Sequence, residues 1–170
     1  MRNKNGFTLI EVIVVTLIIA TLALLVAPSF KNSALTNKME KAKSGLVELY
    51  LAVRLYDEVH PNDQLSGVFS SEMFNKLSND SDDQGYIYMP NASSRWEQKS
   101  LSEDAPYSLK DPDGVLNCRY IVAEDENTLV STKCQFDKID QEGTECYKFF
   151  INKSDPDVIK KSVDEVCDDL

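Results

Sequence analysis

The chain has 170 residues, four cysteines, one histidine and a formal net charge of -10 at pH 7. Its acids concentrate after Pro61, and this negative balance argues against a resting surface for nucleic acid or for an anionic membrane. The residues after Pro61, with the helix predicted before them, have room for one small domain with a single modest core.

The first predicted element is a long apolar helix that begins near Phe7. Residues 7–30 contain one charged residue, Glu11, and are long enough to cross a bilayer. An acid at the centre of a membrane helix costs roughly 2.5 to 3.5 kcal/mol, and less toward an end, so such a group normally has a partner. Arg2 and Lys4 precede the run without an acid, which predicts that this end stays cytoplasmic while the rest crosses the membrane.

Two simpler interpretations of this apolar run exist. A cleaved secretory signal has an apolar core of about 7 to 15 residues and an A-x-A-like site, whereas this core is longer and runs into Ala27 and Pro28 without one. A plain signal anchor is consistent with the length of the run. Neither interpretation accounts for Glu11.

The residues around this acid resemble a known motif. The run Gly6–Glu11, Gly-Phe-Thr-Leu-Ile-Glu, is similar to the prepilin motif of type IV pilins and type II secretion pseudopilins. In that family a short basic leader ends in Gly, and the mature chain begins with a methylated Phe. The resemblance covers roughly residues 1–61, and Pro28 lies where many members have a helix-weakening proline.

The resemblance implies a processing step and an assembly step. The prepilin peptidase/methyltransferase, an aspartic membrane protease, would cut between Gly6 and Phe7, because a residue without Cβ lets a protease approach the backbone closely. Phe7 would then be N-methylated. In the family the new α-amine pairs with the acid of a neighbouring subunit, which here is Glu11, so the cost of a buried charge is relieved only by assembly.

The resemblance also implies partners and a location. The partners are the prepilin peptidase/methyltransferase, the membrane, an inner-membrane assembly platform, and other copies of the chain or related pilins. From the residues we predict no cofactor, and from the charge no nucleic-acid partner. The expected location is the bacterial inner membrane, crossed once with a cytoplasmic N-terminus, and afterwards an extracellular or periplasmic filament.

Four parts are expected along the chain. They are a cleaved basic leader at 1–6, a transmembrane and assembly half of the helix at 7–30, an amphipathic half at 31–60, and a globular α+β head at 61–170 with a disulfide-bounded C-terminal region. Pro28 lacks an amide donor and should kink or loosen the helix. Pro61 restricts His60 and should end it.

The amphipathic half of the helix carries two apolar stripes. They recur at steps of three and four residues and at steps of four. The first comprises Met39, Ala42, Leu46, Leu49, Val53 and Tyr56, and the second comprises Val47, Leu51 and Leu55. We interpret one stripe as packing on the chain's own head and the other on neighbouring helices in a filament; spacing alone equally fits one wide core face. Lys38, Lys41 and Lys43 are expected on a solvated face.

Dense turn residues after Pro61 separate short elements. Their composition predicts a helix at 71–77 and strands at 85–89, 115–123, 128–136 and 145–151. The predicted class is therefore α+β and pilin-like, with the long N-terminal helix packed against a small antiparallel sheet. A last helix is predicted with Ser154 or Asp155 as its cap, Pro156 in its first turn, and Val158, Ile159, Val163 and Val166 facing inward.

A hairpin is predicted around Glu126. If residues 125–127 form a three-residue loop, Ala123 faces Leu129 and Cys118 lies opposite Cys134, at about 4.5 to 5.5 Å between Cα atoms, which a disulfide can bridge. The pairing gathers one core face from Cys118, Tyr120, Val122, Val130, Thr132, Cys134 and Phe136. The opposite face is more polar, with Arg119, Ser131, Lys133 and Gln135.

This pairing leaves Cys146 with Cys167. Their bridge would pin the tail to the strand that contains Phe149 and Phe150. Export to an oxidising space favours disulfides over zinc, although four cysteines allow three connectivities. In the family that the motif resembles, a disulfide-bounded C-terminal region is the exposed and variable part of the subunit.

Other chemistry is sparse in this sequence. Asp80, Asp82 and Gln84 resemble the start of an EF-hand loop, but Asn91 occupies the closing position, where calcium needs a bidentate Glu. We therefore expect no metal site, and this loop is the single calcium candidate. His60 is expected in a solvated turn, and Trp96 either in an adhesive loop or as a lid on the core.

The sequence thus predicts a structural subunit and no enzyme, since we find no nucleophile motif and no phosphate loop. The favoured function is a type IV pilin-like subunit that polymerises through its N-terminal helix into a pilus or pseudopilus. One alternative is a minor pilin or pseudopilin of a type II secretion or DNA-uptake machine. Another is a single-pass anchored binding domain that never polymerises.

Overall fold

The computed structural model describes residues 8–78, 86–100, 102, 105–137, 143–155 and 159–164, and for residues 24–32 and 159–164 it describes the backbone alone. Helix α1, Leu9–Val59, has 51 residues and at 1.5 Å per residue is about 75 Å long. The amide of His60 donates to the Tyr56 carbonyl at 2.8 Å, and the helix ends there. Pro61 follows directly, so the predicted end of the helix is confirmed.

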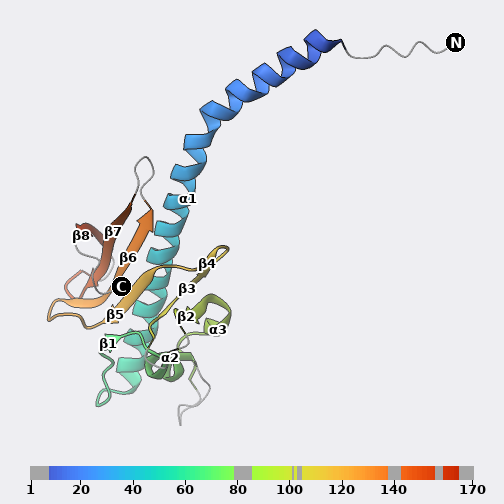
Figure 1. Cartoon of the computed structure of the whole chain (residues 1–170). Coiled ribbons are helices and arrows are strands. Elements are labelled where there is room, and N and C mark those ends of the chain that lie inside the picture. Colours follow the sequence, from blue (N-terminus) through green and yellow to red (C-terminus); the bar gives the residue numbers. More distant parts are fainter. Residues whose placement is uncertain are drawn as a thin grey trace.

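The N-terminal part of α1 extends away from the head, and the helix changes direction within its blue N-terminal half (Figure 1). The backbone is helical through residue 28. Because the side chain of Pro28 is outside the described residues, a kink caused by Pro28 stays a prediction.

The head contains two antiparallel sheets beside the C-terminal half of α1 (Figure 1). The larger has the order β1-β5-β6-β7-β8, and the smaller has the order β2-β3-β4. Strands of the larger sheet are β1 Gly67–Val68, β5 Cys118–Val122, β6 Thr128–Asp137, β7 Thr144–Asn152 and β8 Ile159–Asp164. The others are β2 Trp96–Gln98, β3 Tyr107–Asp111 and β4 Gly114–Val115, with short helices α2 Ser71–Ser78 and α3 Ala92–Arg95. The α+β class is confirmed.

The core forms where α1 packs on the larger sheet. The first stripe of α1 enters it, with Leu46, Leu49 and Val53 at 0% exposure. The second stripe does not, since Leu51 and Leu55 are each 52% exposed. The interpretation of one wide core face is therefore wrong, and the two stripes meet different surroundings.

Gly45 lets the head approach α1 closely. A Cβ at this position would lie 2.5 Å from the Leu109 side chain and 2.9 Å from the Tyr120 hydroxyl. That hydroxyl donates to the Ala42 carbonyl at 3.2 Å, and Tyr120 is fully buried. Contact between α1 and strands β3 and β5 thus depends on a residue without a side chain.

The predicted hairpin between β5 and β6 is confirmed residue by residue. Cys118 pairs with Cys134 and Val122 pairs with Val130, and the Ala123 amide donates to the Leu129 carbonyl at 2.7 Å. In the turn, the Asp125 carboxylate accepts hydrogen bonds from the backbone amides of Asn127 and Thr128. The predicted face of seven core residues is buried throughout.

Two predicted elements are wrong. Residues 86–89 form no strand, because the amides of Tyr88 and Met89 both donate to the Leu77 carbonyl at the end of α2. The predicted C-terminal helix is replaced at 159–164 by β8, which pairs antiparallel with β7. The open edge of β7 offers backbone hydrogen bonds, and β-branched Ile159 and Val163 suit a strand, so sheet pairing overrides the helix-start signal.

The predicted strand at 115–123 is also divided. Val115 ends β4 beside β3, whereas Cys118 begins β5 in the larger sheet. The chain therefore changes sheets between these residues. The predicted elements at 71–77, 128–136 and 145–151 are confirmed as α2, β6 and β7.

Candidate functional site

The N-terminus of α1 is organised by a capping box. Thr8 is the N-cap, and its backbone amide and hydroxyl each donate to Oε2 of Glu11 at 3.1 Å. The Glu11 amide donates in return to Oγ1 of Thr8 at 3.4 Å. This arrangement satisfies two amides that have no partner within the helix, and it holds the carboxylate at the positive end of the helix dipole. Gly6 and Phe7 are outside the described residues.

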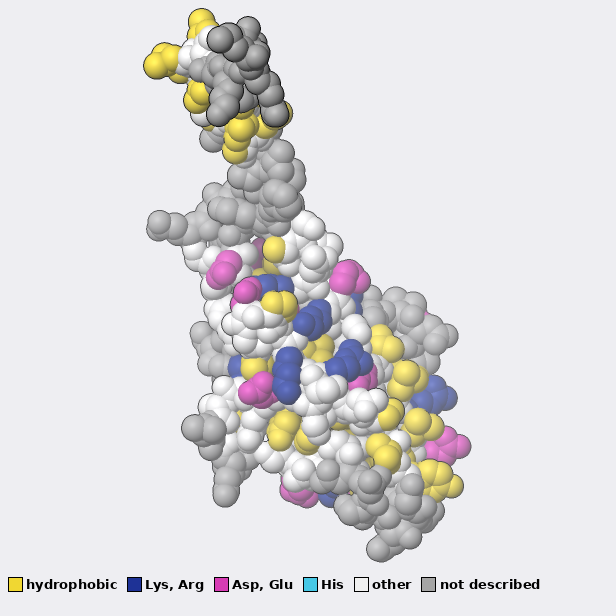
Figure 2. All heavy atoms as spheres, turned by 90° about the vertical axis from the view of Figure 1, so that its right-hand side faces the viewer, with side chains coloured by type: hydrophobic (Ala, Val, Ile, Leu, Met, Phe, Trp, Pro, Cys, Tyr) yellow, Lys and Arg dark blue, Asp and Glu magenta, His cyan; other side chains and the backbone are white. Residues whose placement is uncertain are grey.

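Apolar side chains surround this carboxylate. Between residues 8 and 23 Glu11 is the one charged residue, and Figure 2 shows apolar side chains gathered around this end of the helix. The hydroxyls of Thr16 and Thr21 donate at 2.9 Å to carbonyls three residues earlier. Their hydrogen-bond donors are therefore already satisfied within the helix. Exposed large apolar residues here are Leu9, Ile10, Val12, Ile13, Val14, Val15, Leu17, Ile18, Ile19 and Leu22.

Such a continuous apolar surface on an unpaired helix indicates a contact with lipid or protein. In the part of the chain that the structure describes, no helix combines the length and apolarity of a membrane span. The span predicted at residues 7–30 includes Phe7 and the side chains of 24–30, which are outside the described set.

The C-terminal half of α1, which lies beside the head, also carries exposed apolar side chains. Val47, Leu51 and Leu55 are 37%, 52% and 52% exposed. They form one line along α1, because residues four apart lie on the same face of a helix. The helix therefore presents apolar side chains to its surroundings both beyond the head and beside it.

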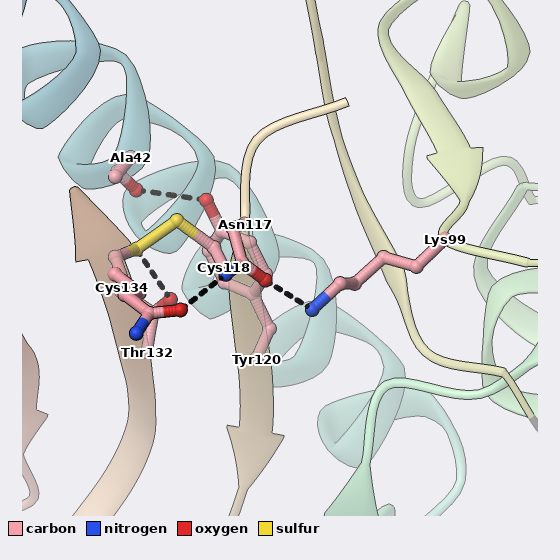
Figure 3. Close-up of a disulfide and its surroundings, with 8 residues drawn as sticks. Ala42, Lys99, Asn117, Cys118, Tyr120, Thr132 and Cys134 are labelled. Carbon is pink, nitrogen blue, oxygen red and sulfur yellow. Dashed lines mark hydrogen bonds between the residues drawn. A yellow bond between two sulfur atoms is a disulfide. The ribbon is translucent and has the colours of Figure 1, made fainter. Parts of the chain in front are cut away.

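A disulfide joins strands β5 and β6. Cys118 and Cys134 are bridged, with 4.1 Å between their Cα atoms and both residues fully buried, which confirms the predicted pair. Figure 3 shows Tyr120 reaching from the same strand to the Ala42 carbonyl of α1. The bridge thus cross-links the hairpin close to the point at which β5 binds α1.

The second predicted bridge is described at one end. Cys146 is disulfide-bonded, and no cysteine within the described residues is free. Its predicted partner, Cys167, is outside the described residues. The pairing of Cys146 with Cys167 therefore stays a prediction.

The basic cluster at the start of the head does not form a merely solvated face. Lys41 binds Asp111 at 3.1 Å, and Lys38 lies 3.9 Å from Asp111 and 3.7 Å from Asp113. Lys43 binds Glu40 at 2.6 Å. Asp111 ends β3 and Asp113 lies in the turn to β4, so these ion pairs hold this end of the smaller sheet against α1. Sequence spacing could not show this contact, because the partners are about 70 positions apart.

Glu48 of α1 lies half-buried beside α3. It forms an ion pair with Arg95 at 2.8 Å. Burial raises the pKa of Glu48, while the charge of Arg95 and the Trp96 side chain partly oppose the increase. Trp96 is 2% exposed and meets the Phe69 and Tyr120 rings edge-on, so it belongs to the core and not to an adhesive loop.

His60 has a packing role at the end of α1. Its ring stacks on Tyr56 at 4.4 Å between centroids, and Tyr88 meets it edge-on at 6.2 Å. The Tyr56 hydroxyl donates to Asp63 at 2.7 Å. This partly buried aromatic group corrects the expectation of a solvated turn. The calcium candidates Asp80, Asp82 and Gln84 are outside the described residues.

The comparisons with known proteins agree with the N-terminal motif. Residues 1–27 match a family model described as the prokaryotic N-terminal methylation motif, which is the signature of type IV pilins and pseudopilins. No match was found among curated proteins or solved structures. Residues 1–27 thus carry the type IV pilin and pseudopilin signature, and this motif supports a pilin-like or pseudopilin protein.

Proposed function

We propose that this chain is a filament subunit that polymerises through α1 into a pilus or pseudopilus. One observation supports the proposal most strongly. At the start of a long helix, a single carboxylate is surrounded by apolar side chains that its own head leaves exposed. The helix therefore needs an apolar environment and its acid needs a cation.

Processing supplies that cation. Cleavage between Gly6 and Phe7 creates a new amine on the residue directly before Thr8, four positions from Glu11. Before assembly the first half of α1 is held in the inner membrane, where Thr8 shields the Glu11 carboxylate. In the filament the methylated amine of Phe7 in one subunit pairs with Glu11 of its neighbour, and this pairing sets the register between subunits.

The second apolar stripe extends the same contact along the helix. Val47, Leu51 and Leu55 continue the line of exposed apolar side chains into the head region. Packing against neighbouring helices would remove them from water at about 25 cal/mol per Å² of apolar area. Residues 7–30 and 31–60 then act as one assembly element, with residues 61–170 as the head on its outer side.

The decisive measurement is N-terminal mass spectrometry of the mature chain. A chain that begins at N-methylated Phe7 supports the proposal, and filaments built from unprocessed precursor would contradict it.

The abundance of the chain in filaments distinguishes the alternatives. A chain that is abundant in sheared filaments is a main subunit, and a scarce chain whose deletion blocks secretion or DNA uptake is a minor pilin or pseudopilin. A retained leader and a dispersed membrane protein would indicate an anchored binding domain.

Glu11 itself is tested by substitution. Glu11→Ala and Glu11→Leu should be inserted and processed but should lower filament yield about tenfold or more, because one unpaired buried charge costs more than about 1.4 kcal/mol. Glu58→Ala is the matched control, since Glu58 is an exposed acid on the same helix. Normal filament yield from either Glu11 variant would remove this residue from the mechanism.

A further inference from the structure

A groove opens at the end of the head that faces the N-terminal part of α1. Its volume is about 550 Å³, within the range of about 300 to 1,000 Å³ that is typical of binding pockets. Leu35 and Lys38 line it from α1, Val115 lines it from β4, and Phe136 and Asp137 line it from β6. Figure 1 shows the arrowhead of β6 at this end of the head, beside α1. We call this surface the α1–β6 groove.

The α1–β6 groove combines apolar walls with acidic groups. Phe136 is 5% exposed, and Leu35 is partly buried. The carboxylates of Asp111 and Asp113, which also line the groove, have the lysines of α1 as partners. Asp137 is exposed at the end of β6, and no ion pair among the described residues includes it. The groove therefore suits an apolar segment that carries one positive charge.

The second apolar stripe of α1 contains such a segment. Leu51 and Leu55 are each 52% exposed, and Arg54 is exposed between them. The Arg54 guanidinium donates to the Tyr50 hydroxyl at 2.7 Å. Because this acceptor is neutral, and no described carboxylate forms an ion pair with Arg54, the hydrogen bond leaves the positive charge unbalanced. The segment thus matches the groove in both apolarity and charge.

The groove and this segment lie on opposite sides of α1 within one chain. At about 100° and 1.5 Å per residue, Arg54 is about 160° around the helix from Lys38 and about 24 Å further along it. One chain therefore cannot fill its own groove. Copies that start in one membrane are parallel, so the segment of one copy reaches the groove of another only after a displacement of about 24 Å along α1. A contact between two different surfaces at different heights does not close on itself, and it repeats from copy to copy as in a fibre.

We propose that the segment Leu51–Leu55 of one copy occupies the α1–β6 groove of a second copy, where Arg54 binds the Asp137 carboxylate. The inference rests on the proposed function, since it assigns a second contact to the same filament. Phe7 and Glu11 are four residues apart, which is about 6 Å along a helix. The N-terminal pair and the groove contact therefore join different copies, and each can be removed without the other.

Cross-linking tests whether the two surfaces meet. Arg54→Lys keeps the positive charge and provides an amine. A water-soluble carbodiimide joins such an amine to a carboxylate in direct contact, as an amide formed with loss of water. Filaments of this variant should yield a peptide pair that links residue 54 to Asp137, identified by mass spectrometry after digestion. Because residue 54 faces away from the groove of its own chain, this link must join two copies.

Charge reversal measures how much the ion pair contributes. Arg54→Asp and Asp137→Arg should each lower filament yield about 2- to 5-fold, as expected for one partly exposed ion pair. The chain with both substitutions should recover the yield. Lys153→Asp and Asp155→Arg are matched controls, because both residues are exposed and neither lines the groove. Both controls should leave the yield unchanged, and thermal unfolding of every variant separates a lost contact from a lost fold.

Three results would overturn the groove contact. They are filaments of Arg54→Lys without a link to Asp137, a double variant that does not recover, and normal yield from Arg54→Asp. If Glu11→Ala abolishes filaments in the same experiment while Arg54→Asp leaves them unchanged, the proposed function stands and the groove contact alone is wrong. A wild-type chain that is cleaved before Phe7 but forms no filaments would overturn the proposed function, and the groove contact with it.

Discussion

At the scale of single residues, Glu11 caps its own helix in the structure, and it is also the acid to which our proposed function gives an intermolecular partner. Thr8-Leu9-Ile10-Glu11 is a capping-box sequence, and the structure shows both of its hydrogen bonds. In the proposed assembly, the amine of a neighbouring subunit would bind a carboxylate that already accepts two hydrogen bonds from Thr8 through Oε2. The spacing of Thr8 and Glu11 in the sequence carries the capping signal, whereas the charge of Glu11 by itself indicates nothing about Thr8.

Gly45 offers a test of the contact between α1 and the head. Gly45→Ala should gain up to about 1 kcal/mol of helix propensity, but the new methyl group would meet Leu109 and the bonded Tyr120 hydroxyl. Overpacking typically costs about 1 to 3 kcal/mol, so we expect net destabilisation and a lower Tm in thermal unfolding. A Tm equal to or above that of the wild type would show that the neighbouring side chains move to accommodate the new methyl group.

Glu124 gives a prediction for the pH dependence of stability. Its pKa is lowered in the folded state, so its stabilising contribution is present above the unfolded pKa of about 4.3 and is lost as pH falls through the lower folded pKa. Glu124→Gln should cost about 1 kcal/mol or less at pH 7. Between about pH 5 and 3 the variant should lose less stability than the wild type in denaturant titrations.

Glu48 should show the opposite sign. Burial raises its pKa, so folding favours its protonated form and its contribution improves as pH falls through the raised value. In the wild type, Glu48 therefore contributes an increase in the free energy of unfolding as the pH falls. Glu48→Gln should remove this increase in denaturant titrations. If the two variants changed the profile in the same direction, one of the two assigned environments would be wrong.

At the scale of elements, α1 separates stability from assembly. Leu49 is fully buried and Leu51 is 52% exposed on the neighbouring stripe. Leu49→Ala should lower the free energy of unfolding by about 2 to 5 kcal/mol. Leu51→Ala should change it by less than about 0.5 kcal/mol while reducing filament yield. Equal effects of the two variants on unfolding would show that both stripes belong to the core.

The β5–β6 hairpin depends on its cross-link. Cys118 and Cys134 are 16 residues apart, and closing a loop of about 15 residues contributes about 3 kcal/mol in the chain-entropy account. The double variant Cys118→Ala, Cys134→Ala should lose about this amount in denaturant unfolding. A loss below about 1 kcal/mol would show that burial of the strands, and not the bridge, maintains the pairing.

Local patterns predicted the elements whose information lies close together in the chain. The step of three and four residues defined the buried stripe of α1, and the turn at 125–127 fixed the hairpin register by simple counting. The elements that escaped prediction depend on distant partners. Strand β8 forms because β7 has an open edge, and residues 86–89 follow the end of α2 instead of extending. Strands β2 and β3 have no distinct pattern of their own.

At the scale of the whole molecule, charge and apolarity are segregated. The N-terminal part of α1 is apolar with one acid, whereas the head view in Figure 2 mixes both charge signs with scattered apolar side chains. A chain that begins at Ser33 should therefore remain monodisperse without detergent in size-exclusion chromatography, and the full chain should require detergent. Aggregation of the shortened chain would locate an apolar contact in the head itself.

The site was predictable in kind but not in its connections. Glu11 was evident because a charge in an apolar run is conspicuous. The ion pair between Asp111 and Lys41 was not evident, because it joins strand β3 to helix α1 and its partners are 70 positions apart. The comparisons likewise match the N-terminal motif alone, so the head must be understood from its own contacts.

The cross-linked hairpin also has a mechanical consequence. In the proposed filament, tension would pass from the helices into each head, and the hydrogen bond from Tyr120 to the Ala42 carbonyl lies at one point of transfer. The sulfur bridge begins two positions away, at Cys118. Pulling should therefore load this covalently closed hairpin directly, and the disulfide should keep its two strands together under that load.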